Sequence, residues 1–223
     1  MQYKVVKKSV GPTGKMDVLL TAAPKRVIEK YINVVKNAGL RPVALETESA
    51  SLARALVAPT DPISIVVSLG ALSTELIVAS LGNVLFTRSI ATGGTTLTRA
   101  IMAEFNLPQN QAEEYKQTYG ILEDKLSGKV AAVLKPILDI IVSEITKAVE
   151  FVHTHVAEAQ VARVIVTGGG AYMPGLAEFL VERTSLEVAL GDPWQLFQKV
   201  GKITELAGQG SFYAVATGLA LRT

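Results

Sequence analysis

Two glycine-containing turns, each at the end of an apolar, strand-like run, limit what this chain can fold into more than any other feature. The first turn occupies residues 69–73, between the apolar runs 63–68 and 74–80. The second is the triple glycine at 168–170, which follows the run 162–167 and precedes a helical pattern. Glycine tolerates positive φ angles and lets another group approach the main chain closely. Both turns therefore predict strands that end in exposed main-chain amides.

The remaining pattern predicts an α/β fold, because strand-like and helix-like segments follow one another along the chain. Expected strands cover residues 3–7, 16–21, 42–45, 63–68, 74–80, 84–90, 162–167 and 186–190, the first two joined by a turn at residues 11–14. Expected helices cover residues 24–38, 47–57, 97–105, 108–119, 125–156, 174–184 and 212–221. Pro136 predicts a kink or a division in the longest of these helices.

Composition excludes several classes of protein. The 223 residues carry a net charge of +2 with acids and bases interspersed, which argues against nucleic acid as a partner. The chain has no cysteine and only two histidines, so it has no disulfide framework. It also has too few suitable residues for a zinc site or a histidine-based catalytic triad. Mean hydropathy is +0.34, but the most apolar window, 130–142, falls short of the roughly 20 apolar residues of a spanning helix.

The first turn has the composition of a phosphate-binding nest. Its small residues would expose consecutive N–H groups, and the hydroxyls of Ser73 and Thr74 would add donors. An ordinary hairpin turn would have the same residues, so both interpretations stay open. The triple glycine favours ligand contact more strongly, because three successive glycines lose conformational entropy that a plain loop need not lose. A helix N-terminus directly after it would add a positive end.

A third candidate is the pair Glu144 and Lys147, which share one face of the expected helix 125–156. The pair could hydrogen-bond a ribose, or it could be a solvated surface pair. His153 and His155 lie two residues apart on the same helix, so they point in different directions and do not form a metal site. The sequence contains neither a GxxxxGK[ST] phosphate loop nor a GxGxxG between strand and helix.

In their order and spacing these segments resemble the actin-like ATPase superfamily, most closely the PilM family of type IV pilus assembly and more distantly the FtsA family of cell division. Residues 20–25 and 39–46 look like the small inserted subdomain, 63–98 like the phosphate-two region, 164–176 like the adenosine loop and 212–221 like the closing helix. The resemblance implies an actin-like (ribonuclease H-like) α/β fold. Its expected parts are a small peptide-binding subdomain at 1–46, helices of an incomplete first lobe at 47–60 and 211–223, and a second lobe at 61–210.

The resemblance also implies a nucleotide site with ATP or ADP and Mg²⁺ as cofactor. With the pair on the long helix, the expected site comprises Ser68, Gly70, Ala71, Leu72, Ser73, Thr74, Glu144, Lys147, Gly168, Gly169, Gly170 and Ala171. The family's first phosphate loop, D-x-G-[ST]-[ST]-x-[IV]-K, does not occur in this sequence, and Ser68 stands where the family usually has Asp. A hard cation on a triphosphate prefers a carboxylate or its ordered waters. We therefore expect weak or absent nucleotide binding, no turnover and no catalytic residue.

By the same resemblance we expect a cytoplasmic scaffold of pilus assembly and twitching motility, peripheral to the inner membrane through a partner. That partner would be the N-terminal peptide of a membrane-anchored, PilN-like protein, held in the region 18–45 by main-chain bonds and apolar pockets. The alternatives are an active actin-like ATPase of the cell-division or cytoskeletal type and, third, a sugar-kinase or chaperone relative. In the actin-like fold the apolar faces of the helices at 47–57 and 211–221 would pack on the sheet of the first lobe. Without that sheet these faces must be buried elsewhere, which predicts a truncated chain or a homo-oligomer.

Overall fold

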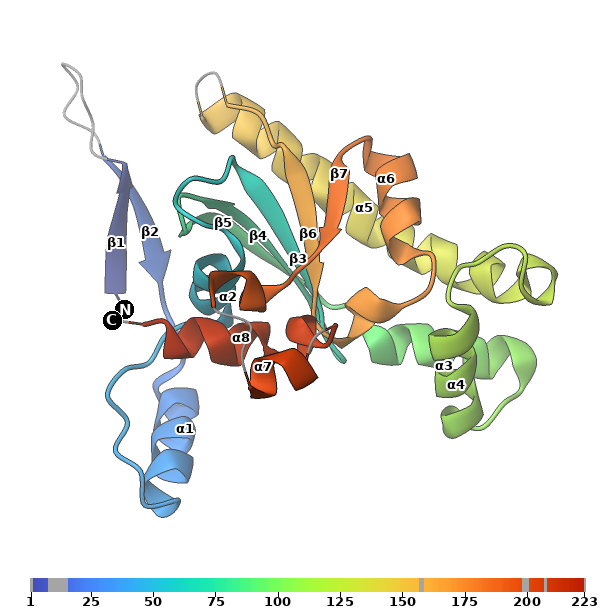
Figure 1. Ribbon diagram of the computed structural model, residues 1–223, viewed down its shortest axis with the longest axis horizontal. Helices are drawn as coiled ribbons and strands as arrows, with labels where there is room; N and C mark the ends of the chain where they lie inside the picture. The colour runs from blue at the N-terminus through green and yellow to red at the C-terminus, as the bar shows by residue number, and fades with distance from the viewer. Residues whose placement is uncertain (1, 8–15, 157–158, 198–200, 207, 223) are drawn as a thin grey trace.

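The centre of the molecule is a five-stranded mixed sheet with the strand order β5-β4-β3-β6-β7 (Figure 1). This computed structural model describes residues 2–7, 16–156, 159–197, 201–206 and 208–222. The strands are β3 (Ser64–Leu69), β4 (Thr74–Ser80), β5 (Asn83–Ile90), β6 (Arg163–Thr167) and β7 (Glu187–Leu190). Neighbours among β3, β4 and β5 are antiparallel, whereas β6 runs parallel to β3 and β7 parallel to β6.

Helices cover both faces of this sheet, so the core has two halves. The larger half contains side chains from α3 (Gly94–Phe105), α4 (Gln109–Tyr119), α5 (Lys129–His155) and α6 (Leu176–Thr184). The smaller half contains side chains from α2 (Glu48–Leu56) and α8 (Gly210–Ala220). Strand alternation sends Ile65 and Val67 into the larger half and Val66 into the smaller one. Burial from both sides explains why β3 is a nearly continuous apolar run.

Four short elements complete this body. They are the 3₁₀ turns η1 (Leu126–Gly128), η2 (Gly169–Tyr172) and η3 (Pro193–Leu196), and the helix α7 (Lys202–Glu205). The long helix α5 runs unbroken through Pro136, so the expected division is wrong. Leu134, Leu138 and Ile141 are buried on both sides of the proline, and this packing holds the helix together although Pro136 lacks an N–H donor.

Residues 2–7 and 16–46 lie at one side of the body (Figure 1). β1 (Gln2–Lys7) and β2 (Asp17–Thr21) form an antiparallel pair, and α1 (Lys25–Asn37) follows. The turn expected at residues 11–14 lies outside the described residues. α1 is amphipathic but has no buried residue, and Tyr31 and Val34 are 66% and 67% exposed. The apolar face of α1 is therefore left open to solvent in this chain.

The strand expected at residues 42–45 is absent, because residues 40–47 form an irregular connection between α1 and α2. Val43 is exposed, and residues 42–45 pair with none of the described strands. β-Branched composition alone does not make a strand without such pairing. Within the described ranges, no helix combines the length and apolar content needed to cross a membrane.

α2 and α8 pack against each other and against the sheet, which gives α2 the cover that we expected it to lack. Thr47 caps α2 by accepting from the Ala50 amide, and Ser51 donates to the Val215 carbonyl at 2.6 Å. α8 still leaves Phe212, Tyr213 and Leu219 exposed. The apolar surface predicted for these two helices is therefore confined to α8.

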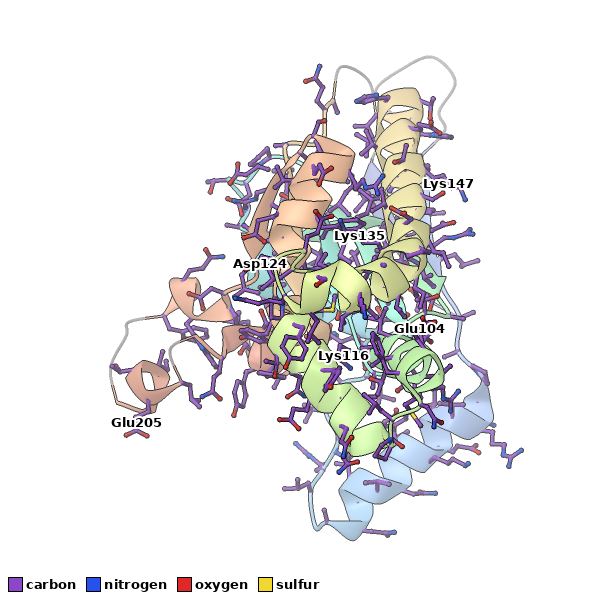
Figure 2. The ribbon with its side chains drawn as sticks, turned by 90° about the vertical axis from the view of Figure 1, so that its right-hand side faces the viewer. Glu104, Lys116, Asp124, Lys135, Lys147 and Glu205 are labelled. Atoms are coloured by element: carbon purple, nitrogen blue, oxygen red, sulfur yellow. The ribbon has the colours of Figure 1, made fainter. Side chains whose placement is uncertain are left out.

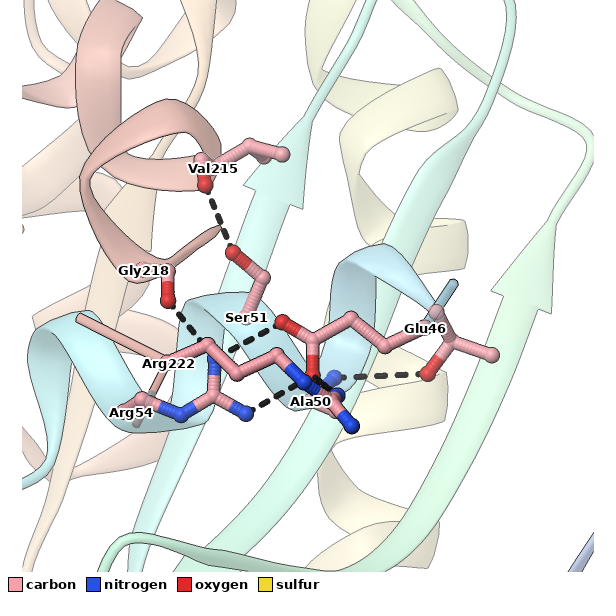
Figure 3. A network of polar contacts seen from close by, with 8 residues as sticks. Glu46, Ala50, Ser51, Arg54, Val215, Gly218 and Arg222 are labelled. Carbon is pink, nitrogen blue, oxygen red and sulfur yellow. Dashed lines mark hydrogen bonds and ion pairs between the residues drawn. The ribbon is translucent and has the colours of Figure 1, made fainter. Parts of the chain in front are cut away.

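An ion-pair network, here named the Glu46 clasp, joins the small N-terminal part to these two helices (Figure 3). Both carboxylate oxygens of Glu46 accept from Arg54 at 2.7 Å, and Arg222 donates to the same carboxylate at 2.6 Å. Arg54 also donates to the Gly218 carbonyl at 2.6 Å. The Glu46 side chain is only 7% exposed, so these charge-assisted bonds are partly shielded from water.

Replacing Glu46 with glutamine is expected to lower the free energy of unfolding by about 2 kcal/mol at pH 7, since hydrogen bonds to charged groups contribute roughly 1.5–3 kcal/mol. The hydrogen bonds from Arg54, opposed by burial and aided by Arg222, hold the pKa of Glu46 below its ordinary value of 4.5. A lowered folded-state pKa stabilises the protein above the unfolded-state pKa, and this contribution is lost as pH falls through the folded-state pKa. Urea titrations of both proteins from pH 7 to pH 3 should therefore converge below pH 4.5; a constant difference would contradict this.

Candidate functional site

The two glycine turns lie side by side at one end of the sheet. β3 and β6 are parallel neighbours in which Ser68 is paired with Thr167, so the turns after both strands meet. A Cβ atom on Gly168 would lie 2.7 Å from the carbonyl oxygen of Leu69. A Cβ on Gly170 would collide with the Leu69 side chain. Main-chain contact between the turns therefore excludes larger residues here.

Of the three successive glycines, Gly168 alone has a positive φ angle, of 82°. Gly169 and Gly170 belong to the 3₁₀ turn η2. Gly170 is required for close approach to Leu69, whereas a Cβ on Gly169 would meet only the Phe212 ring, at 3.3 Å. The helix expected at 174–184 follows as α6, two residues later at its start.

The start of α3 forms hydrogen bonds to the hairpin turn after β3. Gly94 and Thr95 donate their amides to the carbonyls of Gly70 and Ala71, at 2.9 and 2.8 Å. Thr74 is buried and donates its hydroxyl to the Thr92 carbonyl at 2.6 Å. This hydroxyl stabilises the turn and is not the free phosphate donor that the sequence suggests. Ala71 and Leu72 stay exposed at the tip.

A row of polar residues crosses four strands directly beside these turns. Strand register places Ser89, Glu75, Ser68 and Thr167 next to one another on β5, β4, β3 and β6. The next row inward on this face includes Ile77, Val66 and Ile165, which belong to the smaller half of the core. The polar row therefore marks the edge of that core.

Within this row, Glu75 is the residue that sequence reasoning missed. It is partly exposed and forms no hydrogen bond or ion pair with any residue that the structure describes. As the cross-strand partner of Ser68 it points to the same face, so a carboxylate lies next to the serine. The signal was available, because Ser68 and Glu75 flank the hairpin turn symmetrically.

A second cluster that sequence reasoning missed reaches the start of α3 from α4. Lys116, with a side chain 12% exposed, donates to Glu113 at 2.7 Å, to Thr98 at 2.9 Å and to the Gly94 carbonyl at 3.2 Å. Burial raises the pKa of Glu113, but hydrogen bonds from Lys116, Thr98 and Gln117 outweigh it and hold that pKa below its ordinary value. Glu113 therefore stays ionised at neutral pH, and its charge pairs with that of Lys116.

The predicted pair Glu144 and Lys147 forms on α5, with 2.7 Å between Nζ and the carboxylate. Glu144 also pairs with Arg88 on β5 at 2.7 Å. The hydrogen bond from Lys147, opposed by burial and aided by the charge of Arg88, lowers the pKa of Glu144. Lys147 lies on the outer side of α5, away from Lys116 (Figure 2). No contact among the described residues joins this pair to the glycine turns.

An aromatic pair borders the triple glycine on the side of α8. The rings of Tyr172 and Phe212 stack with centroids 4.9 Å apart, and the Ser211 amide donates to the Tyr172 hydroxyl at 3.2 Å. Ser211 also accepts, through its carbonyl, from the Thr167 hydroxyl at 3.3 Å. The N-terminal end of α8 is thereby connected to both the glycine turn and the polar row.

The donor set at this end of the sheet fits a magnesium-nucleotide better than a free metal ion. The described residues contain no group of three or more His, Cys, Asp and Glu that could hold a metal by itself. Mg²⁺ in nucleotide sites uses one or two carboxylates together with substrate phosphates and waters. Glu75 and Ser68 offer such oxygen donors beside the two turns.

Comparison with known proteins shows the family and the fold of this chain. Residues 1–223 match the family described as type IV pilus assembly protein PilM. A chain of a PilM-PilN type IV pilus biogenesis complex is 27% identical with a TM-score of 0.78, and the match covers 99% of this chain and 66% of that one.

Two further solved structures share the fold. The ethanolamine utilization protein EutJ from Carboxydothermus hydrogenoformans is 24% identical with a TM-score of 0.63, covering 90% of this chain and 62% of EutJ. MreB5 of Spiroplasma citri, bound to AMPPNP, is 18% identical with a TM-score of 0.65, covering 90% of this chain and 65% of MreB5. The chain thus spans less than two thirds of the length of each of these three relatives. The fold is actin-like, as predicted, and the chain belongs to the PilM family of type IV pilus assembly proteins.

Proposed function

We propose that this chain is a scaffold of type IV pilus assembly that holds the N-terminal peptide of a membrane-anchored, PilN-like protein. The observation that carries the proposal is the open apolar face of α1, where Val27, Tyr31 and Val34 are exposed at helical spacing. Leu40 and Val43 extend this surface along the irregular connection. An extended peptide can bury these side chains while the connection offers main-chain donors and acceptors.

The proposed location follows from this partner. The chain would lie in the cytoplasm, at the inner membrane, and would be attached there only through the membrane-anchored protein. The likeness to a chain of a PilM-PilN complex supports this assignment. The same argument leaves the small subdomain at 1–46 as the proposed peptide-binding part, next to the lobe at 61–210.

A nucleotide would act here as a conformational clamp. Its phosphates would lie against the exposed ends of the Gly70 turn and the Gly168 turn, beside Ser68, Ser73 and Ala171. Mg²⁺ would contribute charge neutralisation of the phosphates, and Glu75 would orient its waters. Lys116 contacts Gly94, which is bonded to the Gly70 turn, whereas Glu144 and Lys147 contact neither turn, so Lys116 and Glu113 are the better candidates for ribose contact.

Isothermal titration calorimetry with and without peptide tests the scaffold. We expect a synthetic N-terminal peptide of the neighbouring PilN-like protein to bind at micromolar concentration, with phosphate release from Mg-ATP no faster than background. Tyr31→Ala should weaken the peptide at least tenfold, while Phe212→Ala on α8 serves as an exposed aromatic control. Peptide binding that is unaffected by Tyr31→Ala would contradict the proposed location.

Active ATP hydrolysis is the second candidate function, and Glu75 is the observation that favours it. Glu75→Gln should leave ATP binding in EDTA unchanged but abolish the increase in affinity that Mg²⁺ produces. Adding Ser68→Asp to that variant should restore the Mg²⁺ effect, because it moves the carboxylate to the paired strand position. Binding isotherms with and without Mg²⁺ check both outcomes, and an unchanged Mg²⁺ effect in Glu75→Gln would exclude this role.

The two candidate ribose-binding pairs can be separated by matched lysine substitutions. Lys116→Met removes hydrogen bonds to Gly94, Thr98 and Glu113, so we expect ATP affinity to fall about tenfold. Lys147→Met removes one exposed pair, with a side chain 61% exposed, so the expected change is below twofold. Titration of both variants with a fluorescent nucleotide measures the two affinities. A larger loss of affinity in Lys147→Met than in Lys116→Met would place ribose contact at Glu144 and Lys147.

Self-association through α8 is a further part of the proposal. Phe212, Tyr213 and Leu219 leave apolar surface on this helix, which a second copy can cover. Light scattering that gives a stable monomer without hydrophobic-dye binding would count against it.

A further inference from the structure

The open edge of the sheet at β7 presents free main-chain groups. β7 is the last strand of the sheet, and no strand within the described residues pairs with its outer side. Gly191 donates its amide to the Val166 carbonyl at 2.8 Å, so the main-chain groups of Gly191 point toward β6. Successive residues of a strand alternate in direction. The N–H and C=O groups of Val188 and Leu190 therefore point away from the sheet.

A pocket of about 270 Å³ opens beside these groups, between α6, β7 and the η2 turn. Val188 and Leu190 line it from the strand, Ala177 and Glu178 line it from the helix, and Ala171 lines it from η2, where it borders the proposed nucleotide site. Its walls are mostly apolar, and Leu190 and the nearby Val181 on α6 are exposed. The pocket and the open edge form one feature, here named the α6–β7 groove.

Two carboxylates on α6 border this groove. Glu178 lines the pocket and Glu182 lies one turn farther along the helix, and both are exposed and form no ion pair with any residue in the described part of the chain. The neighbouring cation, Arg183, is engaged elsewhere, because it lies 3.7 Å from Asp139 and over the Phe179 ring. The rim of the α6–β7 groove is therefore negatively charged.

We propose that the α6–β7 groove binds an extended, basic segment of another protein by strand addition. Up to four main-chain hydrogen bonds to Val188 and Leu190 would give affinity, and an aliphatic side chain would enter the pocket. Lysine or arginine residues flanking that side chain would face Glu178 and Glu182, which lie one helical turn apart. A second copy of this chain fits less well, because pairing β7 with β7 would bring like charges together.

The probe is a seven-residue acetylated and amidated peptide in which lysine and valine alternate, added to the uniformly ¹⁵N-labelled chain. Amide hydrogen exchange at Val188 and Leu190 is expected to slow at least tenfold at saturation. The Ala189 amide, which points toward β6, should change less than twofold and serves as an internal control. Slowed exchange confined to α1 or to β5 would overturn the proposal, as would no binding at millimolar peptide.

Charge-reversal variants distinguish binding in this groove from nonspecific electrostatic attraction of a basic peptide. Glu178→Lys combined with Glu182→Lys should weaken the peptide at least tenfold, whereas Glu150→Lys, an exposed site on α5, should weaken it less than twofold. A peptide with glutamate in place of lysine should not bind. Equal losses for both charge reversals would overturn the proposal. So would exchange at Val188 and Leu190 that slows with protein concentration alone, since it would assign the groove to a second copy.

Discussion

Gly218→Ala is expected to lower the free energy of unfolding by about 3 kcal/mol, although alanine is the better helix former by about 1 kcal/mol. A Cβ atom at this position in α8 would overlap the carbonyl oxygen of Ser51 in α2 and approach the Ser51 hydroxyl within about 2.5 Å. Because the main obstacle is main chain, a change of rotamer cannot relieve it. α2 and α8 must move apart, which opens the smaller half of the core.

Thermal and urea unfolding monitored by circular dichroism measure this effect. For a domain of this size the expected change in Tm is roughly −10 °C. Ala216→Gly is the matched control, since Ala216 is an exposed residue of the same helix and the substitution changes only helix propensity and backbone entropy. It should cost no more than about 1 kcal/mol. A Gly218→Ala protein as stable as the parent would show that α2 and α8 are not packed as described.

Gly168→Ala is expected to reduce nucleotide affinity at least tenfold and to lower stability by about 2 kcal/mol. Two effects add: alanine is strained at a φ angle of 82°, and its Cβ would meet the Leu69 carbonyl oxygen at 2.7 Å. The substitution would push the Gly168 turn away from β3, and a ligand held against both turns would lose one side of its site.

Gly39→Ala isolates the first of these effects. Gly39 has a similar φ angle of 76°, but no atom lies within 4 Å of the position its Cβ would take. This variant should lose about 1 kcal/mol and keep its nucleotide affinity. Fluorescence anisotropy with a labelled ATP analogue, together with urea titrations, compares the two. Equal affinities in both variants would mean that the contact between the two turns is not part of a nucleotide site.

Most elements of the fold could be predicted because each depends on a local pattern. The apolar runs that became β3, β4 and β6 were located to within a residue at each end, and Pro108 and Gly120 mark the ends of α4. The errors lie where the outcome depends on distant residues. The run at 42–45 pairs with none of the described strands, and α5 continues through Pro136 because packing on both sides outweighs the missing hydrogen bond.

In the candidate site, too, some features could be predicted from local sequence and others depend on distant residues. Glycine identity at residues 70 and 168 was informative because few other residues tolerate such close main-chain contact, and at residue 170 because the Leu69 side chain leaves no space for a Cβ atom. The choice of Glu144 and Lys147 rested on spacing along one helix, and spacing carries no information about which way that helix faces. Lys116 reaches the start of α3 only because α4 folds back against α3. No pattern within the sequence of either helix shows that the two pack together.

By itself, the sequence determined where strands turn and where the main chain must come close, since glycine and β-branched residues restrict φ and ψ locally. Only the tertiary structure decided which polar side chains meet. Strand register brought Glu75 beside Ser68, and the crossing of α2 and α8 completed the Glu46 clasp with Arg222, 176 residues away. Such contacts join segments far apart in the chain, so they depend on how whole elements pack and not on any pattern within one of them.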